Sequence, residues 1–274
     1  MPVPVVDVER HAMVATSVGD LLAVVTLRGA AGDALGQAVV TSGNESSTIA
    51  ISKPDGAPLQ AATTEQLLGA ALAEVIALGG GEVHWWISDA TSDDEAVAAA
   101  TGLDPGRRLL QMGRGLPIGR PIEISTRPFR PGEDDSAWLA VNNRAFAGHP
   151  EQGGWTVRTL AQREAEPWFD PQGCLLHERD GRLAGFCWTK LHDIATPEVV
   201  GEIYVIAVDP DFHGLGLGSQ LTLAGLASIF ERGVADAMLY VDAANLQAVR
   251  MYERLGFTTR RVDQAYTSVL TARR

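Results

Sequence analysis

Cysteine is scarce in this chain, and long apolar runs are missing from it. Only Cys174 and Cys187 are present, each within an apolar stretch, so a disulfide scaffold is excluded and both thiols are expected to be reduced core residues. No stretch of 18 uncharged apolar residues occurs, which argues against a membrane-spanning helix. The first ten residues, MPVPVVDVER, carry acids early and lack the layout of a signal peptide, so the expected location is the cytoplasm.

Positively charged residues are also fewer than negatively charged ones. The 274 residues include 22 Lys and Arg against 34 Asp and Glu, for a formal net charge of -12. Nucleic acid and anionic membrane surfaces repel such a protein, so neither is expected as a partner. A cationic amine substrate suits this field, whereas the sequence says nothing about the oligomeric state.

Two kinds of catalytic site have no counterpart in the sequence. The six His are scattered without a His-x-x-x-His spacing, and the Cys are unpaired, so no metal site is predicted. No serine nucleophile elbow occurs either. With hydrophobic residues at 46% and charged residues at 20%, the chain has enough apolar material for two cores.

The C-terminal half shows a clear order of elements. Asp180-Gly181 between two apolar runs predicts a hairpin of strands 174–179 and 182–189. A strand is expected next at 198–208, and after a glycine-rich turn an apolar helix at 216–230, a strand at 237–241, a helix at 245–255 and a last strand. Asn245 is a fitting N-cap for the second helix and Gly256 a fitting residue at its end.

The N-terminal half repeats this order with almost no residue identity. Expected elements are a hairpin (21–27 and 35–41), a strand (48–52), a helix (63–78), a strand (83–88), a short helix (92–100) and a strand (108–112). Thr63 with Gln66 reads as a capping box that opens the first of these helices. We interpret the repeat as a degenerate tandem duplication, with domains at 1–115 and 122–274 and a linker within 113–131; two unrelated α/β halves are the alternative.

A glycine-rich loop, residues 208–218 (VDPDFHGLGLG), joins a strand to the apolar helix of the C-terminal half. Glycines at 214, 216 and 218 let the backbone turn sharply, and the helix points free N–H groups and its positive dipole end at the loop. This arrangement favours an anion, and a pyrophosphate fits it. A Walker loop is excluded because the lysine is missing, and the Gly-x-Gly-x-x-Gly fingerprint fails at Ser219 and Leu221. A ligand-free glycine turn is the alternative.

The corresponding loop of the N-terminal half, residues 52–59, carries Pro54 and Pro58. Proline lacks the N–H donor that a phosphate requires. We therefore expect the N-terminal copy to have lost its cofactor site.

With these residues the chain resembles the GCN5-related N-acetyltransferase superfamily, and within it the tandem two-domain mycothiol synthase family. The resemblance spans residues 107–270 and is carried by 141–156 with the specific run HPEQGGW, by 186–190, by 201–205, by the glycine loop and by 240–257. It implies two GNAT-like domains, each a mixed central sheet flanked by helices, in an α/β (α+β) chain. It also implies transfer of acetyl from acetyl-CoA to the cysteinyl amine of desacetylmycothiol, without a metal.

The resemblance assigns roles by position. Glu202 is implied as general base or amine-binding carboxylate and Tyr252 as the acid that protonates the leaving thiolate, with substrate contacts from Glu151, Lys190 and Tyr240. The implied acetyl-CoA contacts are Ile206, Ala207, Val208, His213, Gly214, Leu215, Gly216, Leu217, Gly218, Ser219, Asn245, Ala248 and Arg250. His213 stands where the family usually has Gln or Arg, and Leu215 where a second Arg is common, which predicts less positive charge around the cofactor.

The residue chemistry is compatible with these roles. A carboxylate on a strand six residues before Val208 can take a proton from an ammonium group, and a phenol is a fitting acid for a thiolate. A solvated Glu202 and an ordinary core Tyr252 are the alternatives. Two other functions stay open from sequence: acetylation of another small-molecule or protein amine, and CoA binding without turnover.

Overall fold

The computed structural model describes residues 4–16, 19–42, 46–53, 55–149, 152–192 and 199–272. The chain divides into two compact units, Met1–Leu109 with Arg261–Arg274 (unit 1) and Leu110–Arg260 (unit 2). Within the described residues, no helix is both long and apolar enough to cross a membrane.

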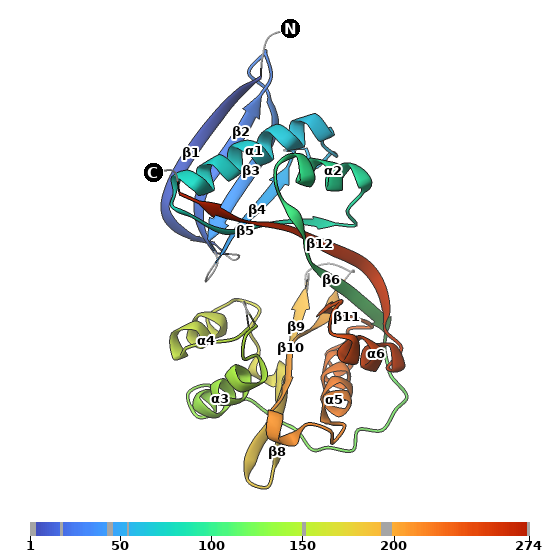
Figure 1. Ribbon diagram of the computed structural model, residues 1–274. Helices are drawn as coiled ribbons and strands as arrows, with labels where there is room; N and C mark the ends of the chain where they lie inside the picture. Colours follow the sequence, from blue (N-terminus) through green and yellow to red (C-terminus); the bar gives the residue numbers. More distant parts are fainter. Residues whose placement is uncertain are drawn as a thin grey trace. The chain divides into compact units, whose positions relative to one another are not determined.

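Unit 1 is a sheet with helices packed on one face (Figure 1). Its strands follow the order β1-β2-β3-β4-β5-β12-β6. The strands are β1 (Val5–Thr16), β2 (Gly19–Arg28), β3 (Ala34–Ser42), β4 (Ser46–Ser52), β5 (Gly80–Ser88), β6 (Asp104–Gly115) and β12 (Thr258–Thr271), and the helices are α1 (Ala61–Ala77) and α2 (Ser92–Ala100). Alternate residues of β2 and β3, among them Ala23, Val25 and Val40, are fully buried and share a core with Leu67 and Leu68 of α1.

The predicted order of elements in the N-terminal half is confirmed, from the hairpin of β2 and β3 to β6. The predicted capping box at Thr63 is wrong. The backbone N–H of Thr63 already donates to the Gln60 carbonyl at 2.9 Å, so Thr63 lies inside the first turn and Gln60 is the N-cap, without a side-chain cap. The capping box instead occurs at α2, where Thr91 and Asp94 bond reciprocally.

Unit 2 has helices on both faces of its sheet, with α3 and α4 on one side and α5 on the other (Figure 1). The strand order is β6-β11-β10-β9-β8-β7. The elements are β7 (Arg127–Pro128), α3 (Asp135–Ala145), α4 (Val157–Glu164), β8 (Cys174–Arg179), β9 (Arg182–His192), β10 (Val200–Val208), α5 (Leu217–Glu231), β11 (Asp236–Asp242) and α6 (Leu246–Arg254), with short 3-10 turns η1 (Pro171–Gly173) and η2 (Pro210–Phe212).

The two faces of the unit 2 sheet bury different side chains. On the α3 side, Trp138 is fully buried and its ring lies 4.7 Å from that of Phe186 and 5.6 Å from that of Trp188. On the α5 side, Cys187, Ile203 and Leu226 share an aliphatic core. Cys174 and Cys187 are both buried free thiols, as predicted. Burial raises the pKa of the Cys187 thiol to about 12, so it is an inert core group.

The last strand differs from the predicted division of the chain. Residues 261–274 belong to unit 1, because β12 pairs antiparallel with β5 from Asp263 opposite Ser88 to Thr271 opposite Gly80. The strand thus extends the sheet of unit 1, although it follows the elements of unit 2 in the sequence. The predicted linker 113–131 contains the end of β6 and the short β7, with irregular structure between them.

Candidate functional site

Strands β10 and β11 pair over three residues and then separate. Their parallel register runs from Gly201 opposite Ala237 to Ile203 opposite Leu239, whereas β10 continues to Val208 and β11 to Asp242. On its other side β10 stays paired with β9 as far as Val208, with an irregularity between Ile203 and Val205. The backbone of residues 204–208 therefore presents polar groups toward an opening in the sheet, beside the predicted cofactor residues Ile206, Ala207 and Val208.

The glycine loop follows the open end of β10 and leads into α5. Gly214 has φ 79° and Gly216 has φ 74°, both in the left-handed region that favours glycine. Gly216 is the N-cap of α5, no side chain caps this end, and the first turn contains no acid. The N–H groups of this turn, where Leu217, Gly218 and Ser219 lie, are thus available to an anion.

The side chains of the loop are arranged around these amides. The Leu217 side chain is buried with Phe212 and Ala184, so only its backbone can serve a ligand, whereas Leu215 is half exposed. A ring nitrogen of His213 lies 3.1 Å from the Val208 carbonyl oxygen and ties the loop to the end of β10.

Two carboxylates of the loop are neutralised by arginines. Arg144 of α3 lies 3.2 Å from Asp209 and 2.8 Å from Asp211, and Arg182 of β9 lies 2.7 Å from Asp211. Hydrogen bonds from both guanidinium groups lower the pKa of Asp211 to about 2. The loop therefore carries little uncompensated negative charge where an anion is expected.

Glu202 lies one residue before the point where β10 and β11 separate. Only 8% of the residue is exposed, which excludes a freely solvated position. Lys190 is its cross-strand partner on β9, and Nε2 of His192 lies 2.6 Å from Glu202 Oε2. Glu202, Lys190 and His192 therefore share one face of the sheet, the face that α3 and α4 cover farther along.

An aromatic group adjoins Lys190 on this face. The Lys190 ammonium lies 4.6 Å from the ring centre of Trp168 and 5.7 Å from that of Tyr204, in cation–π contact with both. Burial raises the pKa of the Tyr204 phenol. His192, Trp168 and Tyr204 were not predicted from the sequence. His192 follows Lys190 by two residues on β9, and Tyr204 follows Glu202 by two residues on β10, so the two-residue period of a strand could have identified both.

Tyr252 projects from α6 into the core of unit 2. The residue is 6% exposed, its ring packs edge-on against Phe257, and burial is the main cause that raises its pKa. The neighbouring Met251 is close to the first turn of α5. A Cβ atom added to Gly218 in this turn would lie 3.4 Å from Met251 Sδ. The structure thus brings α6 next to the glycine loop.

Of the remaining predicted residues, those that the structure describes lie on β11 and on α6 with its N-cap. Asn245 is the N-cap of α6 as predicted, with its side chain accepting from the Ala248 N–H at 3.1 Å. Arg250 is exposed on α6, and the Tyr240 hydroxyl, one residue beyond Leu239, accepts from Gln111 Nε2 at 2.8 Å. Glu151 lies outside the described residues.

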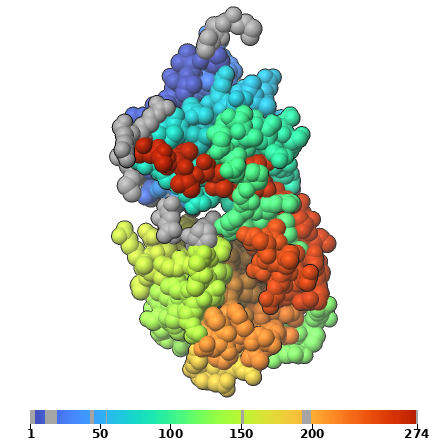
Figure 2. Space-filling model, viewed as in Figure 1, coloured from blue at the N-terminus to red at the C-terminus, as the bar shows by residue number. Residues whose placement is uncertain are grey.

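Figure 2 shows the surface of unit 2 recessed between the yellow-green helices α3 and α4 and the red segment that contains α6.

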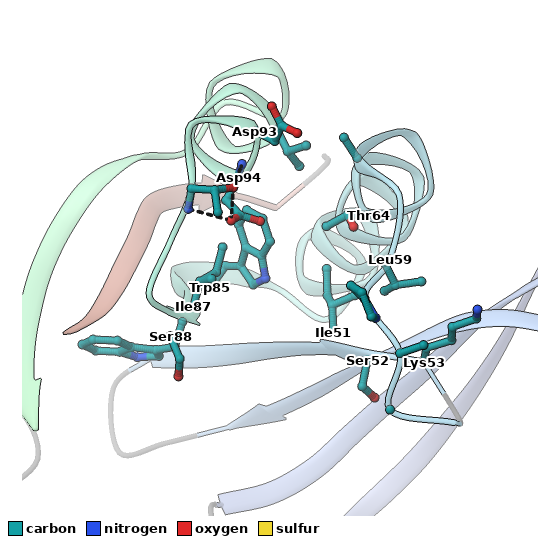
Figure 3. Close-up of a pocket in the computed structure, with 17 residues that line it drawn as sticks. Ile51, Ser52, Lys53, Leu59, Thr64, Trp85, Ile87, Ser88, Asp93 and Asp94 are labelled. Carbon is teal, nitrogen blue, oxygen red and sulfur yellow. Dashed lines mark hydrogen bonds between the residues drawn. The ribbon is translucent and has the colours of Figure 1, made fainter. Parts of the chain in front are cut away.

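Unit 1 has a pocket at the corresponding place in its own sheet. Strands β4 and β5 pair with each other only from Ser46 opposite Glu82 to Ile49 opposite Trp85, and both continue beyond this point without pairing to one another, as β10 and β11 do. A cavity of about 570 Å³ occupies this opening, and Figure 3 shows Trp85 and Ile51 on its walls below α1 and α2. Pro58 lines the cavity and Pro54 lies outside the described residues, so the expected loss of cofactor binding by this copy stays a prediction.

Comparison with known proteins agrees with this arrangement. Residues 138–257 match the Acetyltransferase (GNAT) family. A GCN5-related N-acetyltransferase from Sphaerobacter thermophilus superposes with a TM-score of 0.74 at 20% identity, over 90% of this chain and 81% of that one. A tandem GNAT protein from the clavulanic acid biosynthesis pathway superposes with a TM-score of 0.67 at 17% identity, over 93% and 84%. The tandem α/β fold predicted from the sequence is thereby confirmed.

Sequence similarity is higher to a group of curated proteins. The mycothiol acetyltransferase of Thermomonospora curvata is 50% identical over 194 residues, which are 69% of this chain and 64% of that relative, slightly less than two thirds of its length. The mycothiol acetyltransferase of Thermobispora bispora is 48% identical over 205 residues, which are 72% of this chain and 70% of the relative. With this identity and coverage, the chain belongs to the mycothiol acetyltransferase family of GNAT acetyltransferases.

Proposed function

We propose that this protein transfers the acetyl group of acetyl-CoA to the cysteinyl amine of desacetylmycothiol. The observation that carries the proposal is the opening between β10 and β11, which has Glu202 at its closed end and the uncapped N-terminus of α5 beside its open end. The identity to mycothiol acetyltransferases supports the choice of acceptor.

Acetyl-CoA fits this opening as a substrate. The diphosphate would accept hydrogen bonds from the amides at the start of α5, the pantetheine arm would lie along residues 206–208, and Asn245, Ala248 and Arg250 would border its other side. The pairing of Asp209 and Asp211 with arginines supports this placement, because free carboxylates there would repel the phosphates.

The chemistry then requires three proton transfers. Glu202 accepts the proton that the acceptor ammonium must lose, and the freed nitrogen lone pair forms a bond to the acetyl carbon. The bond from this carbon to sulfur breaks, and the departing thiolate takes the proton of Tyr252. The nitrogen then gives up its second proton, which restores the Tyr252 phenol and leaves a neutral amide. Burial raises the pKa of Tyr252, so the phenol still carries its proton at neutral pH when the thiolate forms.

A transfer assay with mass detection tests the proposal. Wild-type protein is expected to acetylate desacetylmycothiol, with about 100-fold or larger losses in kcat for Glu202→Gln and at least about 10-fold for Tyr252→Phe. Glu178→Gln, which changes an exposed carboxylate at the end of β8, is the control and should retain activity. Transfer to polyamines or aminoglycosides but not to desacetylmycothiol would contradict the proposed acceptor, and wild-type rates in Glu202→Gln would contradict the proposed base.

A further inference from the structure

The base of the proposed reaction has a partner that positions it. We propose that His192 is a positioning residue, which donates from Nε2 to Glu202 Oε2 and so leaves the other carboxylate oxygen, Oε1, directed at the acceptor amine. This inference rests on the proposed function for the role of Glu202, and on the structure for the pair itself.

The hydrogen bond is short and partly shielded from water. His192 Nε2 and Glu202 Oε2 are 2.6 Å apart, with 29% and 10% of the two side chains exposed. An ionised carboxylate only accepts hydrogen bonds, so the proton of the pair lies on Nε2. A charge-assisted bond at this distance fixes the orientation of a carboxylate more firmly than solvent can.

The register of the strands explains how the pair forms. His192 lies opposite Val200 and Lys190 opposite Glu202 in the antiparallel pairing of β9 and β10. His192 and Glu202 are therefore diagonal neighbours on the same face, a separation that long or aromatic side chains bridge. Both strands belong to the sheet that carries the opening, so the carboxylate is held from a rigid element.

Other charged groups face this region but hold different partners. Lys190, the cross-strand neighbour of Glu202, places its ammonium over Trp168 and Tyr204. Arg163 and Glu166, at the end of α4, act electrostatically on the Tyr204 phenol, as Glu202 does. Among the described residues, His192 is thus the side chain placed to orient Glu202.

Three variants test this role. His192→Ala is expected to lower kcat by about 10- to 100-fold while the KM for acetyl-CoA changes by less than about 3-fold, since the carboxylate is misplaced but the cofactor loop is untouched. His192→Gln can supply a neutral N–H donor, so kcat should recover to within about 5-fold of wild type. His84→Ala, which breaks a His–Glu pair in unit 1 where Nε2 lies 3.6 Å from Glu82, is the matched control and should leave kcat unchanged.

A second measurement separates this inference from the proposed function. In NMR spectra of the wild-type protein and of Glu202→Gln, the Nε2–H proton of His192 should lie far downfield in the wild type and move upfield when the charged acceptor is replaced. If the wild-type protein does not acetylate desacetylmycothiol, the proposed acceptor is wrong and this comparison still tests the pair. An unchanged Nε2–H resonance in Glu202→Gln, or wild-type kcat in His192→Ala, would overturn the inference.

Discussion

Ile203 of β10 and Leu239 of β11 are the last residues that pair these two parallel strands, although both strands continue beyond them. Glu202 precedes this point on β10 and Tyr240 follows it on β11. The glycine loop begins where β10 ends. The separation of β10 from β11 therefore places the carboxylate of Glu202, the opening between the strands and the N-terminus of α5 in one part of unit 2.

Gly216 should be needed for its backbone conformation rather than for space. A Cβ at this position would meet nothing within 4 Å, but the φ of 74° is strained for any other residue. Gly216→Ala is expected to raise the KM for acetyl-CoA by about 10-fold and to lower the free energy of unfolding by about 1 kcal/mol. Steady-state kinetics and urea unfolding measure both; Gly119→Ala is the control, because Gly119 has equal space without a positive φ.

Burial of Tyr252 should appear in the alkaline stability of the protein. Its pKa is raised in the folded state, whereas in the unfolded chain it is about 10. Below about pH 10 both states keep the proton, and above it the unfolded state loses the proton first, so stability falls as pH rises. Urea unfolding between about pH 8 and pH 11 should show a smaller decrease for Tyr252→Phe than for wild type; equal decreases would mean that the phenol is not buried.

Helix α5 should tolerate no side chain at Gly225. A Cβ there would lie 2.8 Å from Ile203 Cδ1 and would also collide with Cys187 Sγ, because the helix backbone approaches the sheet closely. Gly225→Ala is expected to lower the free energy of unfolding by about 1–3 kcal/mol. Gly69→Ala, in α1 with nothing within 4 Å, should instead raise it by about 0.5–1 kcal/mol. Thermal or urea unfolding decides both signs.

The arginines that neutralise the loop carboxylates should support binding of acetyl-CoA. Arg144→Met combined with Arg182→Met leaves Asp209 and Asp211 uncompensated beside the proposed diphosphate position. The KM for acetyl-CoA is expected to rise by about 5- to 50-fold, and the effect should shrink at high salt. An unchanged KM at low salt would place the diphosphate elsewhere. Arg179→Met, at the end of β8 and next to Asp180, is a control for the loss of an exposed arginine.

The sequence predicted those elements whose signals are local. Asp180 and Gly181 have φ values of 53° and 73°, so the Asp-Gly signal gave the right hairpin of β8 and β9. Asn245 and Gly256 marked the ends of α6 correctly, because a side-chain cap and a left-handed glycine are properties of a few adjacent residues. Thr63 is not the N-cap, because α1 begins earlier in the chain than predicted, at Ala61, with Gln60 as its N-cap.

Features that depend on distant contacts were not accessible in this way. The separation of β10 from β11 depends on register, which the hydrophobic pattern of one strand does not contain. The contacts of Trp168 with Lys190 and Tyr204 join a loop after α4 to two strands. The edge strand β1 and the helices α3 and α4 were not predicted, although Thr156, which forms a capping box with Thr159 at the start of α4, is a local signal that could have been used.

The most direct test of the account measures the amides of the glycine loop themselves. Hydrogen–deuterium exchange of the intact protein, with and without saturating acetyl-CoA, reports on peptides that cover residues 213–219. We predict slower exchange in these peptides on binding, together with protection of residues 204–208. Binding of acetyl-CoA without protection of residues 213–219, or no binding at all, would contradict the central claim that the start of α5 holds the diphosphate.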